Sequence, residues 1–118
     1  MNCNLKSLVG LPEYTCPEIN VADNNLTTLE GCPKHMKTFC CAGNQLTSLI
    51  GAPEYVDGDF DCDNNQLTTL EGCPKYVKED FDCRRNPHLK SLKGIGRVDG
   101  LIYSDFFVGK LEDYKGEL

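Results

Sequence analysis

The sequence predicts a solenoid whose short parallel β-strands stack on one face and whose convex side is extended or turn-like. Two observations lead to this fold class. A leucine-led block of eight residues recurs along the chain, and a block with the alternating apolar pattern of a strand precedes most copies. A unit that recurs every 20 to 22 residues is too small to bury its apolar side alone, so neighbouring units must stack to form one continuous core.

The leucine-led block is the clearest internal repeat. It reads Leu-Thr-Thr-Leu-Glu-Gly-Cys-Pro at 26–33 and again at 67–74, and Leu-Thr-Ser-Leu-Ile-Gly-Ala-Pro at 46–53. Weaker copies begin at Leu5 and Leu89. The steps from one leading leucine to the next are 21, 20, 21 and 22 residues, which gives about five repeats. The Gly-x-Pro of the return leg lacks a helical pattern and indicates extended or turn-like backbone.

The preceding block predicts the strands and the core. Apolar residues alternate in it as on a half-buried strand, so we expect strands near 19–21, 39–41, 60–62, 81–83 and 102–104. Stacking brings one apolar residue of each copy into a column, made of Ile19, Phe39, Phe60 and Phe81. A second column holds Val21, Cys41, Cys62 and Cys83. An asparagine follows each strand and should point inward, where its amide can satisfy backbone groups as the chain turns: Asn24, Asn44, Asn65 and Asn86.

Joined together, the two blocks read apolar-x-apolar-x-x-Asn-x-Leu-x-x-Leu, which resembles the consensus of leucine-rich repeats. The short period and the Gly-x-Pro return leg are similar to the compact repeats of bacterial effector proteins. The chain looks even more like tandem Leu-Thr-Ser-Leu-Glu-Gly-x-Pro repeat proteins of phages and bacteria, which carry a strand such as the Asp-Phe-Asp-Cys at 80–83. The resemblance implies a leucine-rich-repeat solenoid and a viral or mobile-element origin.

The whole chain, 1–118, fits a single leucine-rich-repeat domain. At 118 residues it is long enough for one continuous core and too short for a separate catalytic domain beside it. We expect an N-terminal half repeat at 1–12, repeats over 13–97, and a degenerate repeat with a C-terminal cap over 98–118. The half repeat offers no cap of its own, so self-association through that end stays open, and the sequence does not fix the oligomeric state.

The charge balance limits the kinds of partner. The chain carries 18 acidic and 12 basic residues for a net charge of −6, which repels phosphate and disfavours direct binding to nucleic acid or to an anionic membrane. A basic partner would be attracted. The first residues lack the pattern of a signal peptide and no apolar stretch approaches membrane-spanning length, so we expect a cytoplasmic protein, in the host cytoplasm if it is phage-encoded.

The eight cysteines favour packing over chemistry. Three of them share a column with Val21, and two share a repeat position with Ala52, as small buried residues do. The sequence has no Cys-x-x-Cys pair, and its two histidines occupy different repeat positions, so we expect neither a metal site nor a cofactor. Whether Cys16 or Cys40 is reactive stays open, and Cys40 falls on a strand position that should face outward.

The outward-facing strand positions carry the candidate site. Alternation places a dense group of aspartates on this face, because strand residues that flank a buried side chain point away from the core. The predicted partner-binding set is Asp59, Asp61, Asp63, Asp80, Asp82, Arg84, Tyr103 and Asp105. Like charges across neighbouring strands cost about 0.2–1 kcal/mol per contact, so a group this dense should not be a folding device. Arg84 and its neighbour Arg85 are expected either to balance Asp63 and Asp82 or to contact the partner.

These features predict a protein–protein interaction module rather than an enzyme. The sequence contains no Ser-His-Asp set, phosphate loop or paired metal-binding histidine motif. We expect the acidic sheet face to bind a protein with a basic surface. For a phage-encoded chain this would be a protein of the bacterial host, such as a defence protein, that the chain inhibits or modulates. The alternatives are an acidic mimic that blocks a nucleic-acid-binding enzyme, a face that binds calcium or a small ligand, and a surface that only maintains solubility.

Overall fold

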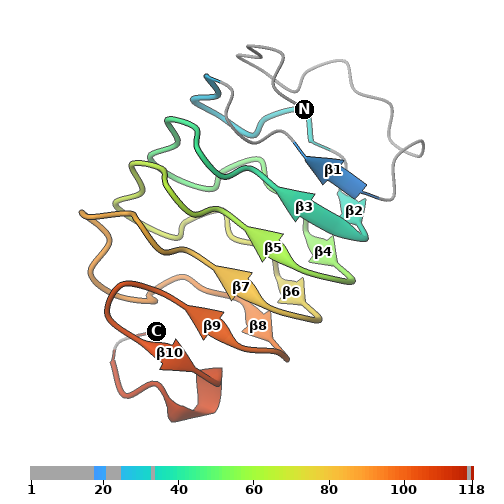
Figure 1. The fold of residues 1–118 in the computed structure, drawn as a ribbon. Helices are drawn as coiled ribbons and strands as arrows, with labels where there is room; N and C mark the ends of the chain where they lie inside the picture. The colour runs from blue at the N-terminus through green and yellow to red at the C-terminus, as the bar shows by residue number, and fades with distance from the viewer. Residues whose placement is uncertain (1–17, 21–24, 33, 117) are drawn as a thin grey trace.

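The chain folds as a parallel-strand β-solenoid with almost no helix (Figure 1). The computed structural model describes residues 18–20, 25–32, 34–116 and 118, with the backbone alone at 18–20. Successive turns of the chain lie side by side and contribute strands to two parallel sheets. The expectation of a solenoid with short parallel strands on one face is therefore confirmed.

The larger sheet has six strands in the order β1-β3-β5-β7-β9-β10. Its strands are β1 (Glu18–Asn20), β3 (Thr38–Cys40), β5 (Phe60–Asp61), β7 (Phe81–Asp82), β9 (Ile102–Tyr103) and β10 (Val108–Gly109). Neighbours pair in parallel except β10, which returns antiparallel to β9. The parallel strands begin and end within one residue of the predicted positions, because the buried phenylalanines set the register of the alternation.

A second, parallel sheet of four strands adjoins the first, in the order β2-β4-β6-β8. Its strands are β2 (His35–Met36), β4 (Tyr55–Val56), β6 (Tyr76–Val77) and β8 (Arg97–Val98). In each strand the second residue is buried and the first is more exposed. The sequence predicted only extended or turn-like backbone here, because two residues are too few to show an alternating pattern.

Aromatic rings and thiols form the core columns that the alternation predicts. The fully buried rings stack with centroids 5.6 and 5.3 Å apart, in the column Phe39, Phe60 and Phe81. The thiol column is also buried and consists of the free cysteines Cys41, Cys62 and Cys83. The predicted first members, Ile19 and Val21, lie outside the residues whose side chains are described. Burying each large apolar side chain contributes about 1.5–3 kcal/mol, so these columns are the main source of stability.

Buried asparagines join one turn of the solenoid to the next. The Oδ1 atom of Asn65 accepts a hydrogen bond from the backbone N–H of Leu46 at 3.1 Å. Its Nδ2 group donates to the carbonyl oxygens of Cys62 and Cys41, both at 3.1 Å. Asn24 lies outside the described residues. The predicted inward orientation is confirmed for Asn44, Asn65 and Asn86.

The C-terminal segment turns back across the last parallel strand. Ser104 follows the thiol column, and its hydroxyl donates to the carbonyl oxygen of Phe107 at 2.7 Å and accepts from the N–H of Phe107 at 2.8 Å. This turn leads into β10. The ring of Phe107 then meets Tyr114 edge to face at 5.2 Å. The helical part of the described chain is one 3-10 turn, η1 (Leu111–Asp113), and no described helix has the length and apolar character needed to cross a membrane.

Candidate binding site on the six-stranded sheet

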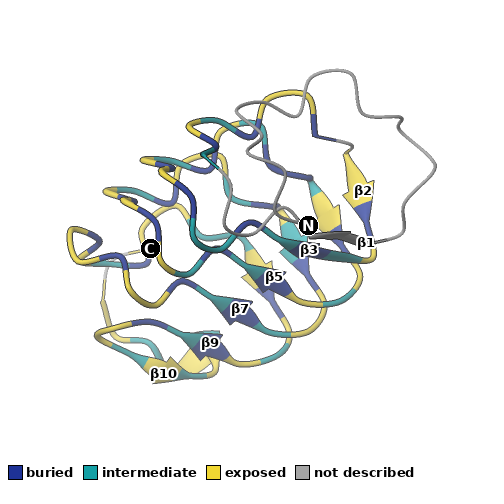
Figure 2. Ribbon diagram, turned by 45° about the horizontal axis from the view of Figure 1, so that its top comes forward, coloured by how far each residue is buried: buried dark blue, intermediate teal, exposed yellow. Residues whose placement is uncertain are grey.

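The candidate site lies on the outer face of the larger sheet. The phenylalanines of β3, β5 and β7 are buried and the next residue of each strand is partly exposed (Figure 2), so that next residue faces outward. Backbone pairing brings these outward residues into one row across the sheet, formed by Cys40, Asp61, Asp82 and Tyr103. The antiparallel strand β10 extends the row with Val108, which pairs with Tyr103.

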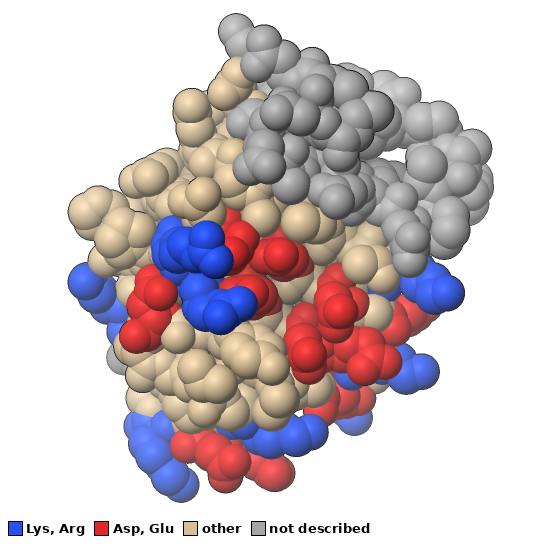
Figure 3. Space-filling model, viewed as in Figure 1, with Lys and Arg blue, Asp and Glu red and all other residues tan. Residues whose placement is uncertain are grey.

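The other predicted site residues flank this central row. Asp59 and Asp80 come just before β5 and β7, whereas Asp63, Arg84 and Asp105 come just after β5, β7 and β9. Figure 3 shows acidic side chains gathered on this face with basic side chains beside them. The two signs of charge therefore meet on one surface.

A shallow hollow of about 170 Å³ opens between the strands of this face. Its lining consists of Asp59, Phe60, Asp61, Asp80, Asp82 and Tyr103. All but one of these residues belong to the predicted partner-binding set, and the exception, Phe60, is the residue of β5 whose side chain is buried in the core. Four carboxylates around one hollow can receive a cationic group by charge-assisted hydrogen bonds.

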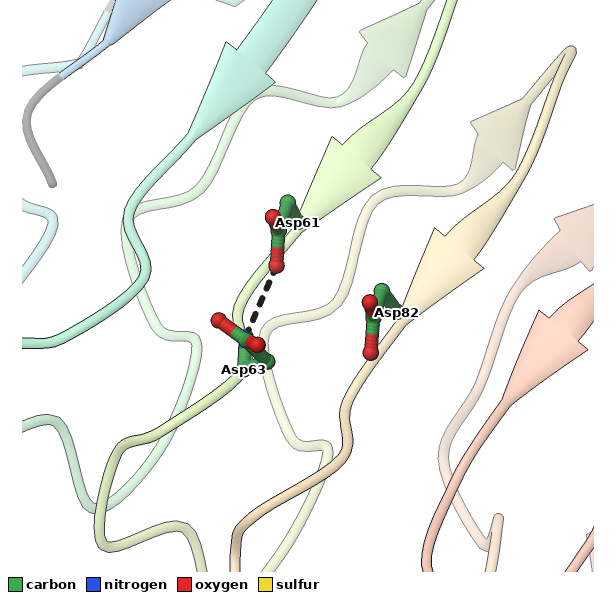
Figure 4. Close-up of side chains that lie close together, drawn as sticks. All are labelled: Asp61, Asp63 and Asp82. Carbon is green, nitrogen blue, oxygen red and sulfur yellow. Dashed lines mark hydrogen bonds between the residues drawn. The ribbon is translucent and has the colours of Figure 1, made fainter.

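Three carboxylates of this face approach one another closely. Asp61, Asp63 and Asp82 each offer an oxygen atom within 4.8 Å of the others (Figure 4). The backbone N–H of Asp63 donates to Oδ1 of Asp61 at 3.0 Å, which fixes the turn after β5. Oxygen ligands of this kind suit hard cations such as Ca²⁺, so the residue types of this cluster fit a metal ion as well as a basic side chain.

Two arginines neutralise part of this carboxylate group. Arg84 donates twice to Asp82, from Nη2 to Oδ2 at 2.7 Å and from Nε to Oδ1 at 3.1 Å. Arg85 lies 3.6 Å from Asp63, measured between Nη2 and Oδ2. Of the two roles that the sequence left open for these arginines, the counter-charge to Asp82 and Asp63 is observed, and the contact with a partner stays a prediction. The guanidinium of Arg84 also lies over the ring of Tyr103, 5.2 Å from its centroid.

Asp61 has no cationic partner within the part of the chain that the structure describes. Burial, together with the negative charges of Asp63 and Asp82, raises the pKa of Asp61 to about 6. The thiol of Cys40 lies 3.8 Å from Oδ2 of Asp61. The charge of the hollow consequently changes just below neutral pH, and a cation placed there would favour the ionised form.

Several aspartates of the predicted set also hold the backbone. The N–H of Asp80 donates to Asp59 at 3.0 Å, and the N–H of Leu101 donates to Asp80 at 2.8 Å. Asp105 accepts from the N–H of Arg85 at 3.0 Å. The expectation that the dense group of aspartates is no folding device is wrong for Asp59 and Asp80, because each accepts a hydrogen bond from a backbone N–H of the next turn. The recurrence of aspartate at the repeat spacing is the sequence signal that could have indicated this backbone role.

The described cysteines near this face are poor nucleophiles. Burial is the main reason that the pKa of the half-exposed Cys40 is raised, and the charge of Asp61 adds to it. Cys62 is completely buried, and burial raises its pKa well above the ordinary value. A thiol that stays protonated reacts slowly. Cys16, the other cysteine whose reactivity was left open, lies outside the described residues.

A larger hollow of about 480 Å³ lies at the C-terminal end, where two of its cationic side chains already bond to Asp99. The Nε group of Arg97 donates to Asp99 at 2.9 Å, and Nζ of Lys110 donates to the carbonyl oxygen of Asp99, also at 2.9 Å. The sheet face, where the described residues offer the Asp61 carboxylate no such cation, is the stronger candidate for binding.

Comparison of the chain with protein-family models, with curated proteins and with solved structures gave no match. The geometry and the chemistry of the sheet face are therefore the basis for inferring what the protein does.

Proposed function

We propose that this chain is a leucine-rich-repeat protein whose outer sheet face binds another protein. The leucine-rich type is supported by the positions of the repeated residues, since Leu67, Leu70 and Asn65 are all buried, as the consensus requires. The observation that carries the binding role is the carboxylate-lined hollow on that face. The carboxylates around this hollow come from β5, β7 and the residues just before them, and Asp61 lies beside Asp82 across the two strands.

The partner in this proposal presents a basic surface. Strands lie about 4.8 Å apart, so the parallel strands of the sheet span roughly 20–25 Å, which matches a standard footprint of about 800 Å². Charge complementarity over such an area speeds association and selects against acidic partners. The resemblance to phage repeat proteins extends the proposal to a cytoplasmic inhibitor or modulator of a bacterial host protein, such as a defence protein, rather than an enzyme.

A second candidate function is an acidic mimic of nucleic acid. The observation that favours it is the pair of carboxylate rows, Asp59 with Asp80 and Asp61 with Asp82, which run side by side across neighbouring strands. A mimic would compete with DNA or RNA for its target, and its affinity would fall steeply with salt. An ordinary protein interface with aromatic contacts would depend less on salt.

The experiment is capture of proteins from bacterial lysate by two matched variants. One variant carries Asp61→Asn, Asp63→Asn and Asp82→Asn, which remove charge but keep an oxygen for the backbone bonds of Asp61 and Asp82. The control removes the same charge elsewhere, by changing Glu30, Glu71 and Glu112 to glutamine at exposed positions. A protein captured by the wild type and the control, and lost by the asparagine variant, supports the proposal. Equal capture by all three proteins would contradict it.

Competition then separates the two candidate functions. The captured protein is challenged with duplex DNA or single-stranded RNA at low and at high salt. Displacement of the chain by nucleic acid, together with loss of binding at high salt, would favour the mimic. Binding that survives both treatments would favour an ordinary protein interface.

A further inference from the structure

The outer face of the larger sheet changes its chemistry at β9. In the row that precedes the strands, Asp59 and Asp80 are followed one turn later by Leu101. In the central row, Asp61 and Asp82 are followed by Tyr103 and then by an apolar residue of β10. Both rows therefore pass from carboxylate to apolar side chains at the same strand.

The apolar part of this face is open to solvent. Leu101 is 37% exposed and Val108 is 61% exposed, so both aliphatic side chains present apolar surface to solvent. Tyr103 lies between the two parts, since it pairs with Val108 and also lines the carboxylate hollow. Figure 3 shows a surface without charged side chains directly beside the acidic and basic side chains of this face.

An internal contact indicates how a cation is bound at the boundary between the two parts. The guanidinium of Arg84 is held by both oxygens of Asp82 and lies over the ring of Tyr103. A carboxylate and a ring on neighbouring strands thus form a cradle for a planar cation. The hollow is lined by that same tyrosine and, besides Asp82, by three more carboxylates, from Asp59, Asp61 and Asp80.

We infer that the partner of this face is a protein segment that combines an arginine or lysine with a large apolar side chain, seated across β5, β7, β9 and β10. The basic side chain enters the hollow beside Asp61, and the apolar side chain covers Leu101, Tyr103 and Val108. This inference rests on the proposed function and names the chemistry of its partner. Charge complementarity selects the basic group, and the exposed aliphatic side chains select the apolar one.

The register of the sheet sets the spacing within the segment. Asp61, Asp82, Tyr103 and Val108 lie on four successive strands, so the distance from Asp61 to the exposed apolar side chain of β10 is about 14 Å. An extended chain advances about 3.3 Å per residue and its side chains alternate between two faces, so basic and apolar residues that contact the same sheet face should be about four positions apart. The two orders, basic first or apolar first, correspond to the two directions across the sheet.

The test is selection from a displayed library of random twelve-residue peptides on the immobilised chain. We expect enrichment of peptides that carry Arg or Lys four positions from Leu, Ile, Phe, Trp or Tyr. Two double variants then test the carboxylate part and the apolar part of the site separately. The first carries Asp61→Asn with Asp82→Asn, and the second carries Leu101→Ser with Val108→Ser. Each should weaken a selected peptide about tenfold or more, as losses at the centre of an interface do. The matched controls are Glu30→Gln with Glu71→Gln, and Ile50→Ser, whose side chain is 50% exposed away from this face.

The outcomes separate the inference from the proposed function. Peptides that need both the aspartates and the apolar pair support the inference. Selected peptides that are basic throughout and bind the Leu101→Ser, Val108→Ser variant normally would overturn it while leaving an acidic binding face in place. No enrichment over the controls would also overturn it, and the proposed function would then be decided by the lysate capture alone. Melting temperatures of all variants establish that losses come from the surface and not from unfolding.

Discussion

Asn65 binds Leu46 across two turns of the solenoid: its Oδ1 atom accepts the backbone N–H of Leu46 at 3.1 Å while its Nδ2 group donates to carbonyl oxygens on both turns. The amide therefore satisfies backbone groups that no strand can pair, since both turns leave their strands at this level. Asn65 is buried, so water cannot replace these bonds. Stacked asparagines of this kind therefore help to hold the turns in register.

Changing Asn65 to alanine should lower the free energy of unfolding by about 3 kcal/mol, because a buried N–H and two carbonyl groups lose their partner. Denaturant unfolding of the purified variant measures this directly. Gln66→Ala, one residue further on at an exposed position, is the control and should change stability by less than about 0.5 kcal/mol. Similar losses for both variants would show that the amide does not have this role.

Substitutions at Gly72 and Gly94 measure the cost of a left-handed φ angle with and without a steric clash. Both have left-handed φ angles, +87° and +93°, but a methyl group on Gly72 would meet the backbone of Ile50, whereas at Gly94 the nearest atom is 3.6 Å away. Gly94→Ala should therefore cost about 1 kcal/mol from the φ angle alone, and Gly72→Ala about 3 kcal/mol or more. Thermal unfolding of the two variants gives the comparison. Equal costs would indicate that the turns can spread apart to admit a side chain.

Asp61 makes stability depend on pH. Because the pKa of Asp61 in the folded protein is about 6 and its ordinary value is 3.8, the folded state favours the protonated carboxyl. The stabilising contribution is fully present below about pH 4 and is lost as the pH rises through about 6. Asp61→Asn should then raise stability by about 1 kcal/mol at pH 7.5 after allowance for solvent screening, and leave it unchanged at pH 4.

The measurement is a set of unfolding curves for wild type and Asp61→Asn between pH 4 and 8. Glu71→Gln, which removes an exposed carboxylate outside the outer face of the larger sheet, is the control. A difference between wild type and Asp61→Asn that stays constant across this range would mean that the carboxyl is not perturbed by its neighbours.

Calcium should have little effect on this face. Arg84 and Arg85 already lie against Asp82 and Asp63, so a metal ion would have to displace them to gain three ligands. We expect 2 mM CaCl₂ to shift the melting temperature by less than about 1 °C, against several degrees for a ligand present at many times its Kd. A shift of several degrees that is absent from the Asp61→Asn, Asp63→Asn, Asp82→Asn variant would instead assign a calcium site.

The sequence was sufficient to place the parallel strands, the core columns and the inward asparagines. Each depends on a local period: Phe60 and Phe81 are one repeat apart, and the residues beside them alternate. The second sheet could not be predicted in the same way, because a strand of two residues such as Tyr55–Val56 is too short to show an alternating pattern.

For the candidate site, the sequence indicated which residues face outward but not what they contact. The bond from the N–H of Leu101 to Asp80 joins residues 21 positions apart, and it exists only once the turns are stacked. The exposed Val108 was missed because it lies on β10, an antiparallel strand. The other repeats have no such strand, and the segment before it at Phe106 departs from the repeat pattern. These features arise from the contact between turns and not from the composition of one turn.

The central claim, that the outer sheet face binds a basic protein, is tested most directly by the affinity of the captured protein for three forms of the chain. Titration calorimetry would compare wild type, the Asp61→Asn, Asp63→Asn, Asp82→Asn variant, and the Glu30→Gln, Glu71→Gln, Glu112→Gln control. We predict a loss of about thirtyfold or more for the asparagine variant and a change of less than about threefold for the control. Equal affinities for the two variants would contradict the claim and assign the binding site to another surface.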